Sequence, residues 1–225
     1  MTILQDHGAE TASGTRASPA NSAVKTYRIA SIPADGIGPE VIAAGLQALD
    51  ALARRDGGFT FDVTEFDWGS DRFKKTGALM PADGRDQIKD FDAIFFGAVG
   101  APDVPDHVTL WGLRLPICQG FDQYANVRPT KILPGITSPL AGVGPGDLDW
   151  VIVRENSEGE YSGNGGRTHQ GMPEEVGTEV SIFTRTGVAR IMRYAFELAR
   201  SRPRKFLTVV TKSNAQRFGM VMWDE

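Results

Sequence analysis

The chain has 225 residues, of which 41% are hydrophobic and 23% are charged, and its formal net charge is −4. These values are typical of a globular protein with one large domain or two small ones. The negative charge argues against a general nucleic-acid binder, which would present a basic face, and no apolar run is long enough to span a membrane.

Residues 1–25 are rich in Ala, Ser, Thr and Gly and lack the apolar core of a signal peptide, so we expect a disordered tail there. The chain has one cysteine, Cys118, which excludes an internal disulfide and favours a reducing compartment such as the cytoplasm.

The segments that follow alternate between strand and helix. Short apolar runs predict buried strands, and apolar residues at helical spacing predict amphipathic helices. In chain order we expect a strand over 27–33, a helix over 39–55, a strand over 59–66, a short helix over 81–89 and a strand over 93–97. This order predicts an α/β layer with a largely parallel sheet.

The second half of the sequence is less regular. A turn-rich segment covers 134–146, and residues 154–171 are polar and rich in glycine. Between and after these segments we expect strands over 124–133, 149–154, 179–183 and 206–211, a helix over 185–201 and the start of another helix over 214–224.

Two glycines, Gly36 and Gly38, precede the helix expected to begin at Pro39. Backbone N–H groups at a helix N-terminus can bind an anion such as a phosphate. The third glycine of the dinucleotide-binding fingerprint is replaced by Val41, which counts against an unrelated Rossmann-type protein. Taken alone, the simpler interpretation is a strand-to-helix turn that requires small residues.

Three arginines, Arg114, Arg128 and Arg154, lie near expected extended segments. A guanidinium group binds a carboxylate through two parallel hydrogen bonds, so two arginines facing one pocket would suit a dicarboxylate. For each arginine alone, a salt bridge with a neighbouring Asp or Glu is the simpler interpretation.

Two further residues could transfer protons. Tyr161 lies among glycines and acidic residues, and Lys212 directly follows an expected strand. A phenol beside a cation can act as a general acid, and an amine at the carboxyl edge of an α/β sheet can accept a proton. The alternatives are a packed loop aromatic and a solvated surface charge. His107 and His169 are isolated and lack metal-ligand spacing.

Five segments in order resemble the β-hydroxyacid oxidative decarboxylases, which comprise the isocitrate, isopropylmalate and tartrate/D-malate dehydrogenases. They are ADGIGPEV (34–41), FFGAVGAP (95–102), FDQYANVRP (121–129), VRENSEGEYSG (153–163) and TKSNAQR (211–217). The resemblance runs from about Tyr27 to the last residue. The stretches DHVTLWG, FDQYANVRP and FELARSRPRK are most similar to the tartrate/D-malate branch.

The resemblance implies roles for the candidate residues. Arg128 and Arg154 would bind the carboxylates of the substrate. Tyr161 would protonate the enolate after decarboxylation, and Lys212, supplied across a dimer interface, would help to remove the proton of the 2-hydroxyl group. The residues near the cofactor would be Asp35, Gly36, Ile37, Gly38, Val99 and Gly100.

The resemblance also implies a fold, an activity and cofactors. Residues 26–105 would be the first segment of a larger cofactor-binding domain, and residues 106–225 would form a smaller α+β domain for substrate binding and dimerisation. The segment after Tyr161 would be an arm that clasps the partner subunit of a homodimer with shared active sites. The expected activity is oxidation, with or without decarboxylation, of a small 2-hydroxy dicarboxylate. It would use NAD and Mn²⁺ or Mg²⁺, with K⁺ as an additional cation.

Two positions depart from the family pattern. Ala34 replaces the first glycine of the usual GDGIG, and it would be strained by about 1 kcal/mol if the site requires a positive φ. Cys118 occupies the position of a first substrate arginine. Arg114, one helical turn earlier, would substitute if the segment is helical, although Pro116 counts against a helix there.

Family members extend well past residue 225, and the resemblance places the metal-binding aspartates beyond it. We therefore expect a truncated chain that is inactive alone and exposes apolar faces, an aggregation liability. The alternative is a non-catalytic remnant that dimerises or binds dicarboxylates.

Overall fold

The computed structural model describes residues 24–225. The tail expected over 1–25 therefore lies outside the described residues, except for Val24 and Lys25, and Lys25 already begins the first strand.

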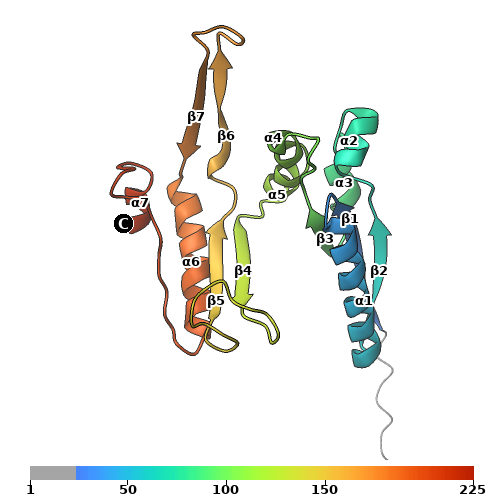
Figure 1. Cartoon of the computed structure of the whole chain (residues 1–225). Helices are drawn as coiled ribbons and strands as arrows, with labels where there is room; N and C mark the ends of the chain where they lie inside the picture. The colour runs from blue at the N-terminus through green and yellow to red at the C-terminus, as the bar shows by residue number, and fades with distance from the viewer. Residues whose placement is uncertain (1–23) are drawn as a thin grey trace, which may run out of the picture.

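A parallel sheet with helices forms the first part of the chain (Figure 1). Its elements are β1 (Lys25–Ala34), α1 (Gly38–Asp56), β2 (Phe59–Glu65), α2 (Ser70–Thr76), α3 (Gly84–Ile88) and β3 (Ala93–Ala98). The strand order is β2-β1-β3, and both neighbours of β1 run parallel to it. The predicted alternation and the parallel sheet are confirmed, whereas α2 was not predicted.

Helix α1 is bounded by the residues that the sequence suggests. Pro39 lies in its first turn, where the fixed φ of proline suits the helix and its missing N–H costs nothing. The helix ends at Gly57, which has a φ of 72° and donates its N–H to the carbonyl of Ala53. Ile42 and Ala53 are buried, and α1 contacts all three strands of the sheet.

A helical segment follows β3 and consists of α4 (Asp106–Thr109), the π-helical turn η1 (Leu110–Arg114) and α5 (Leu115–Gly120). Pro116 lies in the first turn of α5, so it does not break the helix, and the doubt raised by this proline was wrong. Leu113 and Ile117 are buried in the core beneath the parallel sheet, together with Ile32, Trp68 and other apolar residues. The division expected at residue 105 stays a prediction, since this segment packs on the first part.

The remaining elements form two antiparallel strand pairs and a long helix. They are β4 (Ala125–Lys131), β5 (Asp149–Glu155), β6 (Gly159–Thr168), β7 (Val176–Ile182) and α6 (Arg185–Ser201). Strand β4 pairs with β5 and β6 with β7. Helix α6 is capped by the Thr184 hydroxyl, which accepts from the N–H of Gly187 at 2.9 Å, and it packs against β5. The β6–β7 ribbon projects away from the other elements (Figure 1).

Two predictions near the C-terminus were wrong. Residues 206–211 form no strand, because this extended segment pairs with no other strand among residues 24–225, and a strand requires a hydrogen-bonded neighbour. Only the last part of the helix expected over 214–224 is formed, as α7 (Val221–Asp224), after a series of turns. Over the same described range, every helix is too short or too polar to cross a membrane.

Candidate active site

One face of the β4–β5 pair carries the predicted arginines. In the antiparallel register, Asn126 lies opposite Arg154 and Arg128 lies opposite Ile152. Residues directly opposite each other share a face, as do residues two apart along a strand. Asn126, Arg128 and Arg154 therefore lie together on one face, and Arg128 hydrogen-bonds to Asn126 through its Nε at 3.0 Å.

Arg154 and Tyr161 meet directly, as the sequence suggested. The Nη2 of Arg154 donates to the Oη of Tyr161 at 2.6 Å, and the guanidinium carbon lies 4.9 Å from the centroid of the tyrosine ring. Because the phenol oxygen accepts this bond, the hydroxyl hydrogen of Tyr161 remains free to be donated elsewhere. The pair is a general-acid candidate beside a permanent positive charge.

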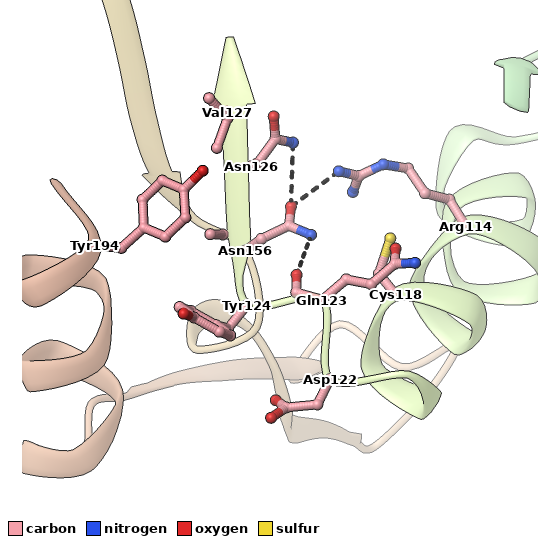
Figure 2. A pocket seen from close by; sticks show the side chains of 10 residues that line it. Arg114, Cys118, Asp122, Gln123, Tyr124, Asn126, Val127, Asn156 and Tyr194 are labelled. Carbon is pink, nitrogen blue, oxygen red and sulfur yellow. Dashed lines mark hydrogen bonds between the residues drawn. The ribbon is translucent and has the colours of Figure 1, made fainter. Parts of the chain in front are cut away.

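A pocket of about 470 Å³ adjoins this face and is shown in Figure 2. Arg114 reaches into it from the end of η1 and donates from Nη2 to the Oδ1 of Asn156 at 2.9 Å. Cys118 of α5, which is partly buried, also lines the pocket. Arg154 and Tyr161 are not among the lining residues, but Arg154 lies opposite Asn126, which is.

The three arginines are all held by neutral groups. Among residues 24–225, none of Arg114, Arg128 and Arg154 forms an ion pair with a carboxylate. Their hydrogen-bond acceptors are the side chains of Asn156, Asn126 and Tyr161. The simpler interpretation, a salt bridge for each arginine, was therefore wrong. Three positive charges remain available for an anion.

The loop after β1 is organised by a buried carboxylate. Asp35 is only 7% exposed, and it accepts from the N–H and the hydroxyl of Ser70, at 2.7 and 2.8 Å, and from the N–H of Gly100 at 2.9 Å. The side chain thus ties together the loops that follow the three parallel strands. Its acceptor sites are occupied by protein donors, which indicates a structural role for a residue predicted to lie near the cofactor.

Gly38 is required by packing, since a Cβ atom there would lie 1.9 Å from the carbonyl oxygen of Pro33. The strand-to-helix turn that needs small residues is therefore present. Gly36 and Ile37 are exposed at the start of the 19-residue helix α1, so their backbone is open to a phosphate of a dinucleotide. Cofactor contacts at these two residues, and at Val99 and Gly100, stay predictions.

Lys212 does not join the site within one chain. Its side chain is exposed, and the segment between α6 and α7 runs beside α6, apart from β4 (Figure 1). Its contribution from a partner subunit stays a prediction. Among residues 24–225, no three His, Cys, Asp or Glu side chains form a group that could hold a metal ion.

Residues 28–225 match the family model described as isocitrate/isopropylmalate dehydrogenase. The chain belongs to the isocitrate/isopropylmalate dehydrogenase family. This membership confirms the resemblance and the α/β fold that it implied.

Similar members of the isocitrate/isopropylmalate dehydrogenase family carry more specific names. The probable tartrate dehydrogenase/decarboxylase TtuC' of Agrobacterium vitis is 78% identical over 202 residues, which cover 90% of this chain and 56% of that protein. D-malate dehydrogenase (decarboxylating) of Escherichia coli strain K12 is 53% identical over 204 residues, with the same coverage of 90% and 56%. The chain thus spans about half the length of the curated relatives it matches.

A solved structure of the isocitrate/isopropylmalate dehydrogenase family has a similar fold. It is the isocitrate dehydrogenase from Methylococcus capsulatus, with a TM-score of 0.70 and 28% sequence identity. The match covers 88% of this chain and 54% of that chain.

One residue of the pocket, Asn156, was not predicted as a site residue. The sequence did hold a signal, because Asn156 follows Arg154 by two positions at the end of an apolar strand and so shares its face. Its contact with Arg114 joins residues 42 positions apart, and local spacing does not reveal such a contact.

Proposed function

We propose that the protein containing this chain oxidises a small 2-hydroxy dicarboxylate, such as tartrate or D-malate, with NAD, and with or without loss of a carboxylate as CO₂. The names of the relatives from Agrobacterium vitis and Escherichia coli support this reaction. The observation that carries the proposal is the group of three arginines around one face, each held by a neutral acceptor.

The arginines would bind the substrate. Arg128 and Arg154 share a face, and Arg114 approaches Asn156 from η1. Each guanidinium group has five N–H donors, so one hydrogen bond to a neutral partner leaves others for a carboxylate. A substrate with two carboxylates would engage more than one of these groups, which favours a dianion over a monoanion.

Proton transfer would be divided between Lys212 and Tyr161. Lys212 would accept the proton of the 2-hydroxyl group while the hydride leaves C2, and NAD, when bound, supplies the hydride acceptor. When the bond to the β-carboxylate breaks and CO₂ leaves, C3 would take the hydrogen that the Tyr161 hydroxyl keeps free. Residues 24–225 contain no group fitted to hold Mn²⁺ or Mg²⁺, so these roles involve only side chains of this chain.

We also propose a homodimer in which the partner subunit supplies Lys212, since this residue lies apart from Tyr161 within one chain. A cytoplasmic location would keep the free thiol of Cys118 reduced.

The proposal is tested with the whole natural protein, NAD, Mn²⁺ and either D-malate or tartrate, by following the absorbance of NADH. We expect turnover by the wild type and a loss on the order of a hundredfold in kcat/KM for Arg154→Gln, because a charged hydrogen bond to the substrate contributes about 1.5–3 kcal/mol. Arg200→Gln, on the exposed side of α6, is the matched control and should retain activity. Absence of NAD reduction by the wild type with every dicarboxylate would refute the proposal. Tartrate binding without reduction would instead favour the non-catalytic alternative.

A further inference from the structure

The geometry points to Asn156 as a positioning residue that aims Arg114 and Asn126 into the pocket while leaving the charge of Arg114 free for the substrate. This inference rests on the proposed function. Asn156 acts through its neighbours, whereas Arg114 is the group that would touch the dicarboxylate.

Asn156 lies at the centre of the pocket wall and joins three segments (Figure 2). It is only 3% exposed. Its Oδ1 accepts from Arg114 Nη2 at 2.9 Å and from Asn126 Nδ2 at 3.3 Å, and its Nδ2 donates to the carbonyl of Gln123 at 3.0 Å. One amide therefore links η1, β4 and the loop before β4.

The orientation of this amide is fixed by its partners. An asparagine oxygen has two lone pairs, and here Arg114 and Asn126 use both. If the amide were turned over, its NH₂ group would face two donors and its oxygen would face the carbonyl of Gln123. Asn156 thus always presents an acceptor to Arg114.

A neutral acceptor differs in its effect from a carboxylate at the same place. Arg190 illustrates the alternative, because its Nη1 contacts both carboxylate oxygens of Asp122 at 2.9 Å and its charge is compensated within the protein. Asn156 holds Arg114 by a hydrogen bond of similar length without compensating its charge. The guanidinium is thereby placed in position and remains attractive to an anion.

The test is Asn156→Asp in the whole natural protein. The new carboxylate would pair with Arg114 and compete with the substrate, so we expect the KM for D-malate or tartrate to rise at least tenfold while kcat falls less. Gln47→Glu adds the same charge on the exposed face of α1 and should leave KM unchanged. An unchanged KM for Asn156→Asp would overturn the inference.

A double-mutant cycle shows whether Asn156 acts through Arg114. We expect Arg114→Gln to raise KM, and Asn156→Asp to change KM less than threefold once Arg114 is absent. Fully additive losses in an active enzyme would overturn the inference and leave the proposed function intact. A wild type that does not oxidise any dicarboxylate would refute the proposed function itself.

A second substitution separates charge from packing. Asn156→Ser is neutral and too short to reach Arg114, so it should raise KM by less than Asn156→Asp does. Stabilisation of each variant by D-malate, measured as a shift in Tm, reports binding without turnover and reveals any variant that is unfolded. An equal or larger effect of serine on KM and on this shift would assign the role to packing and overturn the inference.

Discussion

Ala34 ends β1 with a φ of 58°, a left-handed conformation that glycine adopts without strain and alanine does not. The strain suspected from the sequence is therefore present. We expect Ala34→Gly to increase the free energy of unfolding by about 0.5–1 kcal/mol, because the relieved strain exceeds the entropy cost of glycine. Urea denaturation of both proteins measures the difference.

Ala51→Gly provides the control for this substitution. Ala51 is exposed within α1, where glycine should instead reduce stability by about 1 kcal/mol. Destabilisation by both glycines would show that residue 34 gains nothing from its conformation.

Tyr161 is expected to act after hydride transfer. Tyr161→Phe keeps the ring against Arg154 but removes the hydroxyl group. We expect the proton-transfer step after CO₂ loss to slow by about 10²–10⁴-fold, whereas NADH formation in a single turnover should change far less. Quenched-flow analysis of NADH and of the decarboxylated product separates the two steps. Equal slowing of both would contradict the role assigned to the hydroxyl.

The end of helix α6 is tied to the start of β5 by Arg202 and Asp149, which contact each other at 3.0 Å. The Arg202 guanidinium, and to a smaller extent Lys131, lowers the pKa of the Asp149 carboxyl in the folded protein. A lowered folded pKa gives stability that is present above the ordinary carboxyl value of about 3.9 and is lost as the pH falls through the lowered value.

Arg202→Gln should therefore be less stable than the wild type at neutral pH, and the difference should narrow in acid below about pH 4. Denaturant unfolding at several pH values measures this difference. A gap that stays constant down to about pH 2 would mean that the carboxyl of Asp149 does not contribute through its charge.

Periodic elements were predictable from sequence, and elements held by distant contacts were not. Helix α6 was predicted with its observed bounds, because apolar residues recur on one of its faces. Helix α2 has little apolar pattern, and its first N–H, that of Ser70, bonds to the carboxylate of Asp35. Strand β6 is rich in glycine, which disfavours strands, and its order comes from pairing with β7.

The site was predictable to the extent that residue types carry chemistry. Arg128, Arg154 and Tyr161 were found because their motifs occur in a recognisable order. The neutral acceptors were not, because pairing Arg114 with Asn156 instead of a carboxylate depends on the approach of η1 to β5. Charge compensation is a property of three-dimensional neighbours, so the sequence favoured salt bridges that the structure does not contain.

At the scale of the whole molecule, this chain supplies only part of what its relatives contain, since it covers 56% of their length. Large apolar side chains are exposed, including Phe206 (69%), Val210 (85%) and Phe218 (78%). We expect residues 1–225 expressed alone to show little or no NAD reduction with D-malate or tartrate plus Mn²⁺, and to aggregate more readily than the whole natural protein. Parallel NADH assays and light scattering measure both properties, and robust turnover by the isolated chain would contradict the expectation.

The chain as a whole carries a net charge of −4, whereas Arg114, Arg128 and Arg154 carry charge that no carboxylate compensates among the described residues. A small dianion is thus weakly repelled at long range and attracted at the pocket, and dissolved salt screens both effects over about 10 Å at 0.1 M. Phosphate and sulfate ions have the charge and oxygen geometry that guanidinium groups bind. The choice of buffer anion will therefore alter the apparent affinity for substrate, and phosphate buffers will make the pocket look weaker than it is.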